Sequence, residues 1–301
     1  MEKKINIIEK GRYCRKHLSK NKLDIREVAH PVDKSLIKVL EKVHAKDVLN
    51  APLEQLVSAN YGQLLATGIP LDEKNFPELY SLMQDTCDRL GINIPYTVIS
   101  NELNGINAFA TGTDNNAFIV ISNMAPHFLK PKELQFIISH ECGHVAMEHM
   151  VYHTASSLAA SVGGYVPIVG PVLANTLVFP LNCWNRCSEI TADRIGLICC
   201  GDLHIAQMAL IKIIGGYTDV DDIDIERYVI KSRSLQDTQL LGKLGEYFQS
   251  HPMIYKRLKA MELFSNSEIY YRVINKIPPK DTELLNGDEL NEKTSELLKI
   301  I

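Results

Sequence analysis

The segment His140–His144, with the sequence HECGH, limits the possible structures of this chain more than any other segment. It follows the apolar run Leu134–Ser139, which predicts a helix that begins at Pro131. On that helix the two histidines lie one turn apart on the same face, so both imidazoles can reach a single metal ion. Burying two histidines and a glutamate without such a partner would be costly. The pattern therefore predicts a metal site, and zinc accepts imidazole ligands well.

The glutamate of this motif is placed to act on a water molecule. Glu141 is rotated by about 100° from His140 around the helix, which puts its carboxylate beside the metal's open position and not among its ligands. From there it can take a proton from the attacking water. The sequence thus predicts that His140 and His144 bind zinc and that Glu141 is the general base.

A catalytic zinc site also needs a third protein ligand. The candidate is Glu189, which lies four residues before Asp193 and therefore on the same face of a second predicted helix. Glu189 would bind the metal, and Asp193 would accept a hydrogen bond from a ligand histidine and fix its orientation. The small residues Gly143 and Ala192 would let the two helices approach closely. Without the HECGH motif, a solvated helix face that includes Arg194 would be the better interpretation.

Composition and charge exclude several classes of protein. The chain has 301 residues, of which 46% are hydrophobic and 23% charged, so it is neither disordered nor fibrous. A net charge of −4 makes a dedicated nucleic-acid binder a poor candidate. The first 22 residues are basic but lack the apolar run of a signal peptide, and the 7 cysteines are irregularly spaced. We expect a protein that is not secreted, and that is either cytoplasmic or membrane-associated with its site facing the cytoplasm.

The remaining pattern predicts a mainly helical α+β fold with a small sheet. A helix is expected from Pro77 to Leu90, another after Asp202, and the HECGH helix should continue to at least Met150. Three β-rich pieces separated by turn signals precede the HECGH helix and suggest an antiparallel sheet: Tyr96–Ser100, Ile106–Gly112 and Ala117–Ser122.

An uncharged stretch separates the two segments that carry the site. No Asp, Glu, Lys or Arg occurs between His149 and Asn185, and residues 154–181 are apolar but interrupted by Gly and Pro. Because this segment leaves one site helix and enters the other, we expect a helical hairpin that lies beside the site and controls access to it. Two alternatives stay open, namely a hairpin that only completes the core and insertion into a membrane.

Together these motifs resemble the HtpX/CAAX-prenyl-endopeptidase family of zinc metallopeptidases, which are gluzincins. The resemblance covers roughly residues 75–265, and His149 also fits the family's pattern. It rests on HECGH, the downstream Glu189-x-x-Ala-Asp193, the segment Asn107, Ala108, Phe109 and Ala110, and the later His251-Pro252. The resemblance implies a metalloendopeptidase with one zinc ion per chain that hydrolyses peptide bonds of protein substrates, with an expected role in protein quality control.

The family resemblance also implies a domain organisation. Residues 1–74 would be a helical extension that matches no family motif, and residues 75–265 would be the zinc metallopeptidase domain. The apolar hairpin 154–181 would be an insertion in that domain, and residues 266–301 would form a C-terminal helical tail.

Further site residues follow from the same resemblance. Asn107 to Ala110 would form an edge strand that binds a protein or peptide substrate as an extended strand. His251 would donate to the developing oxyanion, although a histidine before a proline is also a common helix start, and Arg257 would orient a site carboxylate. A second hypothesis is a metal-bearing, chaperone-like protein that binds peptides without cleaving them. Glu141 and Asp193 argue against it, because a pure binder needs no general base.

Overall fold

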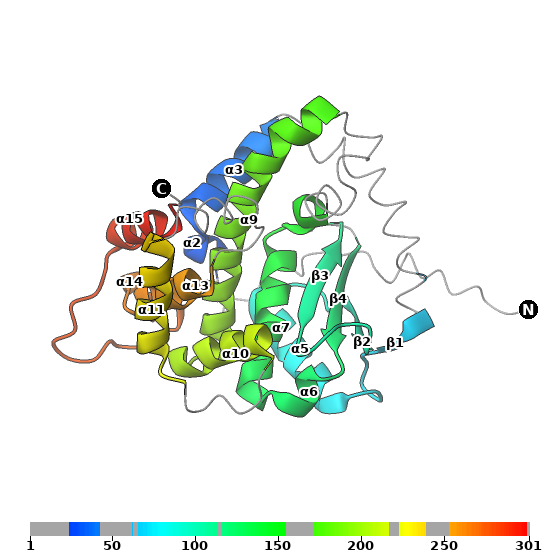
Figure 1. The fold of residues 1–301 in the computed structure, drawn as a ribbon. Coiled ribbons are helices and arrows are strands. Elements are labelled where there is room, and N and C mark those ends of the chain that lie inside the picture. Colours follow the sequence, from blue (N-terminus) through cyan, green and yellow to red (C-terminus); the bar gives the residue numbers. More distant parts are fainter. Residues whose placement is uncertain are drawn as a thin grey trace, which may run out of the picture.

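The computed structural model of this chain describes residues 24–42, 62, 66–113, 116–154, 171–216, 223–238 and 253–299. Two long helices, α7 (Pro131–Ala146) and α9 (Pro171–Cys200), lie at its centre. A small sheet lies beside α7, and a group of shorter helices lies beside α9 (Figure 1). The mainly helical α+β fold is therefore confirmed.

The sheet has four strands in the order β1-β2-β4-β3. Its strands are β1 (Gly68–Pro70), β2 (Tyr96–Ser100), β3 (Ala108–Gly112) and β4 (Ala117–Ser122). The outer pairs, β1–β2 and β3–β4, are antiparallel, and the central pair β2–β4 is parallel. Only the β3–β4 pair was expected, because β1 was not predicted as a strand. The prediction of an antiparallel sheet is thus wrong for the central pair.

Burial explains this difference. All six residues of β4 are buried, and so are four of the five residues of β2, whereas β3 is partly exposed. A consecutive meander would have placed β3 in the middle of the sheet. Instead the two apolar strands take the central positions, where both faces are covered, and β3 takes the edge. This edge position matters for the site described below.

α5 and α10 begin and end close to the predicted residues. α5 (Pro77–Leu90) ends at Gly91, which is left-handed with φ of 73°, and the side chain of Asp202 caps α10 (Leu203–Gly215) by accepting a hydrogen bond from the Ile205 amide. Further helices are α2 (Ile25–Val28), α3 (Pro31–Lys42), α6 (Ala125–Phe128), α11 (Ile225–Thr238), α13 (Ile254–Ser265), α14 (Glu268–Val273) and α15 (Gly287–Leu298).

α7 ends earlier than the sequence predicts. It stops at Ala146 rather than continuing to Met150, and Glu148 adopts a left-handed conformation with φ of 60°. The amide of His149 then donates to the carbonyl of His144 at 3.0 Å. This turn folds the chain back, so that the rings of His149 and His144 come to lie 5.3 Å apart.

The described part of the N-terminal region packs against α9. α2 and α3 lie along this helix (Figure 1). Nη1 of Arg194 donates to the carbonyl of Val28 at 2.9 Å, and the amide of His30 donates to Oγ1 of Thr191 at 3.1 Å. Residues 24–42 therefore share the core of the fold, while the domain boundaries remain a prediction.

The predicted access hairpin, residues 154–181, lies mostly outside the described residues. Residues 171–181 form the first part of α9, which continues as one helix to Cys200. Among the described residues, no helix combines the length and the apolar character needed to cross a membrane. The hairpin and its contact with a membrane remain predictions.

Candidate active site

Two glycines allow α7 and α9 to pack closely at the site. A Cβ on Gly143 would lie 3.3 Å from the side chain of Ile195, and a Cβ on Gly196 would lie 2.9 Å from the ring of Phe136. The role of Gly143 was predicted and that of Gly196 was not. Because the two backbones come so close, short side chains on the facing sides of α7 and α9 can meet.

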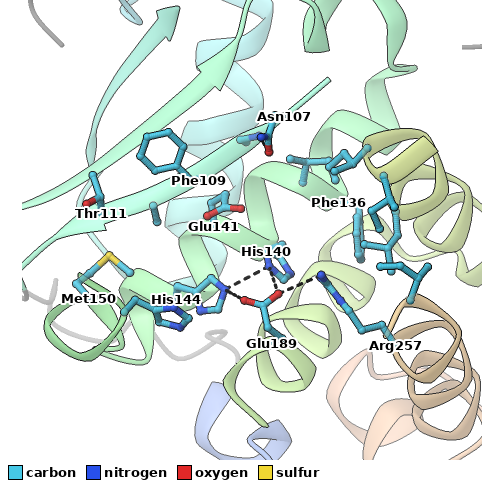
Figure 2. Close-up of a pocket in the computed structure, with 18 of the residues that line it drawn as sticks. Asn107, Phe109, Thr111, Phe136, His140, Glu141, His144, Met150, Glu189 and Arg257 are labelled. Atoms are coloured by element: carbon cyan, nitrogen blue, oxygen red, sulfur yellow. Dashed lines mark hydrogen bonds and ion pairs between the residues drawn. The ribbon is translucent and has the colours of Figure 1, made fainter. Parts of the chain in front are cut away.

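Three buried side chains converge between these helices. Nε2 of His140 and Nε2 of His144 lie 3.2 Å apart, and the Glu189 carboxylate lies 3.5 Å from the first nitrogen and 3.3 Å from the second (Figure 2). A tetrahedral zinc shell with bonds of about 2.0–2.1 Å separates neighbouring ligand atoms by about 3.3–3.4 Å. The donor set and its spacing therefore fit a zinc ion.

Asp193 and Arg257 support this cluster. Oδ1 of Asp193 lies 3.0 Å from Nδ1 of His140, the ring nitrogen that does not face the cluster. Arg257 of α13 donates to both oxygens of Asp193, from Nε at 2.8 Å and from Nη2 at 2.6 Å, and its Nη1 lies 3.1 Å from Glu189. Burial would raise the pKa of Asp193, but Arg257 and His140 hold that pKa below its usual range.

The electrostatics of the cluster favour a cation. Burial penalises the charged form of His140, yet hydrogen bonding and charge interactions with Asp193 and Glu189 prevail and raise its pKa to about 10. Burial lowers the pKa of His144 to about 4, with a further contribution from the charge of His140. The cluster thus attracts one positive charge between its imidazoles and Glu189, and this condition also favours a metal cation.

The cluster lines a cavity of about 530 Å³ that lies between α7, β3 and α10. Glu141 points from α7 toward β3 inside it (Figure 2). Phe136, Ile137, Leu210 and Ile213 form an apolar wall of the same cavity. The cavity can therefore receive an apolar side chain close to the cluster.

β3 borders this cavity as an edge strand. Asn107, Ala108, Phe109 and Ala110 all line the cavity. The carbonyl of Asn107 accepts a hydrogen bond from the Ser122 amide at 2.8 Å, on the side of β4. In an antiparallel ladder, residues that bond to the neighbouring strand alternate with residues that do not.

The alternation assigns the even-numbered residues of β3 to the free side. Ala108, Ala110 and Gly112 direct their backbone N–H and C=O groups away from β4. Gly112 confirms this direction, because its carbonyl accepts from the Thr154 hydroxyl at 2.7 Å and its amide donates to the same oxygen at 3.1 Å. The Ala108 amide donates to its neighbour's side chain, Oδ1 of Asn107, at 2.9 Å. The Ala110 groups are thus oriented toward the cavity.

The structure brings together the predicted site residues that it describes. They are His140, Glu141, His144, Glu189, Asp193, Arg257, Asn107, Ala108, Phe109 and Ala110. His251 lies outside the described residues, so its role at the oxyanion remains a prediction.

One group of side chains beside the cluster was not predicted from the sequence. Nδ1 of His144 lies 3.0 Å from Nδ1 of His149, and Nε2 of His149 lies 3.3 Å from Oδ2 of Asp33 in α3. His149 fitted a family pattern without an assigned role. Asp33 gave no signal, because it is far from the motifs in sequence and occurs in an ordinary amphipathic helix.

The fold and the converging ligands define a helix-based metallopeptidase. Residues 73–264 match the model of peptidase family M48, and the chain belongs to that family. It is therefore a hydrolase that acts on peptide or protein substrates and uses a metal cofactor. The expected family and enzyme class are confirmed.

Similar proteins are known from plants, bacteria and yeast. "Plastoglobule-localized metallopeptidase 48, chloroplastic" of Arabidopsis thaliana is 26% identical over 276 residues, which cover 86% of this chain and 78% of that protein. "Protease HtpX homolog 1" of Streptomyces coelicolor is 25% identical over 220 residues, which cover 64% of this chain and 72% of that protein. The crystal structure of S. mikatae Ste24p aligns with 76% of this chain at 19% identity and a TM-score of 0.39, and the alignment spans 58% of that chain.

Proposed function

We propose that this chain is a zinc metalloendopeptidase in which His140, His144 and Glu189 hold one zinc ion per chain. The observation that carries the proposal is the spacing of their ligand atoms, 3.2 to 3.5 Å, beside Glu141 in a cavity bordered by an edge strand. When bound, zinc would supply a Lewis acid for the peptide carbonyl and would lower the pKa of a coordinated water.

The substrate is proposed to bind as an extended strand beside β3. Ala110 would exchange backbone hydrogen bonds with it, and the carbonyl of Ala108 would accept a further one. An apolar substrate side chain near the cleaved bond would enter the pocket that Phe136, Leu210 and Ile213 line. Backbone pairing tolerates many sequences, so the apolar pocket would supply most of the selectivity.

The proton transfers are assigned to Glu141. Its carboxylate takes a proton from the attacking water and then returns it to the leaving amine. Arg257 holds the carboxylates of Glu189 and Asp193 in place, and Asp193 orients His140. His251 is proposed to donate a hydrogen bond to the developing oxyanion.

The test combines metal analysis with a Glu141→Gln variant. We expect about one zinc per chain in both proteins, and a loss of peptide-bond cleavage by about 10²–10⁴-fold in E141Q, which is the usual contribution of a general base. Glu102→Gln, an exposed acid outside the cavity, serves as the matched control. Full cleavage by E141Q, or a wild-type protein that binds no zinc under any condition, would sink the proposal.

The individual substrates and the location are proposed on the sequence alone. We expect no nucleic-acid partner, with the protein cytoplasmic or held at a membrane through residues 154–181 with its site facing the cytoplasm. Recovering the proteins bound to E141Q from cells, followed by fractionation, tests both points. Misfolded proteins among the captured substrates would support a role in protein quality control.

A further inference from the structure

Three buried side chains form a line of short contacts that ends at His144. Nδ1 of His144 lies 3.0 Å from Nδ1 of His149, and Nε2 of His149 lies 3.3 Å from Oδ2 of Asp33. The side chains of His149 and Asp33 are 0% exposed. Their polar atoms must therefore find partners within the protein.

Asp33 is held in place by α9. Its Oδ1 accepts a hydrogen bond from Nε1 of Trp184 at 2.9 Å, and its Oδ2 accepts one from the hydroxyl of Thr191 at 2.7 Å. Both oxygens of Asp33 therefore accept hydrogen bonds from neighbouring donors, as the oxygens of an ionised carboxylate do.

This acceptor determines where the protons of both imidazoles lie. Nε2 of His149 lies 3.3 Å from this acceptor, which favours a proton on Nε2, and in the neutral ring Nδ1 of His149 is then the acceptor. Nδ1 of His144 then donates to it, which leaves Nε2 of His144 without a proton. That nitrogen faces His140 and Glu189, and only its unprotonated form can bind a metal.

We infer that Asp33 is a positioning residue of the metal centre, which holds His144 through His149 in the tautomer and orientation that bind zinc. The inference rests on the proposed zinc site. Asp193 contacts His140 directly and would fix the orientation of that ring. Asp33 would fix the orientation of His144 in the same way, but through the intervening ring of His149. It lies outside the matched family residues 73–264, in the N-terminal region to which sequence analysis gave no role.

A second metal ion is the competing interpretation of the same histidines. His144, His149 and His153 offer nitrogen atoms that lie within 4.8 Å of one another. However, His144 would then have to bind two ions through its two nitrogens, and Nε2 of His153 is already 2.9 Å from the hydroxyl of Ser188. The hydrogen-bonded arrangement also accounts for Asp33, which a second ion would not.

The first experiment compares Asp33→Asn with a destabilising variant elsewhere in the fold. Asp33→Asn puts an amide where the carboxylate faces His149, and a donor there favours the wrong tautomer. Leu290→Ala removes a buried side chain of α15 that takes no part in the line of contacts, so it controls for loss of stability. We expect D33N to weaken zinc binding by about 10–100-fold, measured by chelator competition, and L290A by less than about threefold. The absorption spectrum of the Co²⁺-loaded protein should change only in D33N.

A second measurement needs no variant of Asp33. Long-range ¹H–¹⁵N spectra of histidine-labelled, zinc-loaded E141Q should show a proton on Nε2 of His149 and on Nδ1 of His144.

A double-mutant cycle is the third test. In a His149→Gln background, D33N should weaken zinc binding by less than about threefold further, because the contact that links Asp33 to His144 is already lost.

The outcomes separate the inference from the proposed function. If the wild type binds no zinc, the proposed function fails and the inference with it. If the wild type binds zinc but D33N binds it equally well, or L290A loses as much zinc affinity as D33N, the inference alone is overturned. The opposite tautomer of His149, or a second metal equivalent that disappears in H149Q, would also overturn it.

Discussion

At the scale of single residues, Arg257 shows how the site tolerates two buried carboxylates. Its guanidinium makes two hydrogen bonds to Asp193 and an ion pair with Glu189, and all three side chains are buried. A buried carboxylate without a partner would be strongly destabilising. The planar fork of arginine matches a carboxylate in a way that a lysine ammonium does not.

Replacing the Arg257 guanidinium with a lysine ammonium should therefore weaken metal binding, although the positive charge is kept. For Arg257→Lys we expect zinc affinity to fall by about 10-fold or more, because Asp193 no longer fixes His140 as firmly. Chelator competition measures this effect. Arg272→Lys is the matched control, since Arg272 pairs with Glu27 on the surface and such pairs contribute about 0–1 kcal/mol. Equal zinc affinity in R257K and wild type would contradict the prediction.

The residues that could be predicted are those whose role depends on local spacing. His140 and His144, and likewise Glu189 and Asp193, are four residues apart on one helix, so helical geometry alone places them on a common face. Asp33 could not be predicted in this way. Its position depends on the packing of α3 against α9, and its contact with His149 also needs the left-handed turn at Glu148.

At the scale of elements, the positions of β3 and β4 in the sheet decide what the site can bind. The strands themselves could be predicted from their β-branched and aromatic residues, but their order could not, because it depends on which strand is buried on both faces. As a result β3 is an edge strand with Ala110 oriented toward the cavity.

Ala110→Pro tests this arrangement. Proline removes the N–H that faces the cavity, and it is tolerated on the free side of an edge strand. We expect the KM of an extended peptide substrate to rise by about 5- to 10-fold, corresponding to one lost hydrogen bond, while zinc content and unfolding temperature stay close to wild type. Ala110→Val keeps the N–H and controls for added bulk. A KM for A110P equal to that of A110V would argue against binding along β3.

At the scale of the whole molecule, the N-terminal helices join the fold through buried polar residues, and His30 is one of them. Burial, and next the charge of Arg194, lower the pKa of His30 to about 4. In the unfolded chain the pKa of a histidine is about 6.5. Between these values the unfolded state binds a proton that the folded state does not, so stability is lost as the pH falls from about 6.5 toward 4.

His30→Gln should reduce this loss. Urea unfolding of the E141Q protein, which cannot digest itself, is compared at pH 7.5 and pH 5 with and without the substitution. We expect the decrease in unfolding free energy between the two values to be smaller by about 1–2 kcal/mol in H30Q. His127→Gln, which changes an exposed ring, controls for the loss of a histidine as such. An identical decrease in H30Q and its parent would refute the role of His30.

Arg194, near the C-terminal end of α9, contacts segments from opposite ends of the described fold. It donates to the carbonyl of Val28 at 2.9 Å and to the hydroxyl of Thr294 at 3.4 Å, and Arg257 of α13 pairs with Glu189 on the same helix. A ribosome delivers the helix with HECGH well before it delivers α13 and α15. The residues expected to hold the metal are therefore synthesised before the segments that support them, so the candidate site can assemble only after α13 has been made.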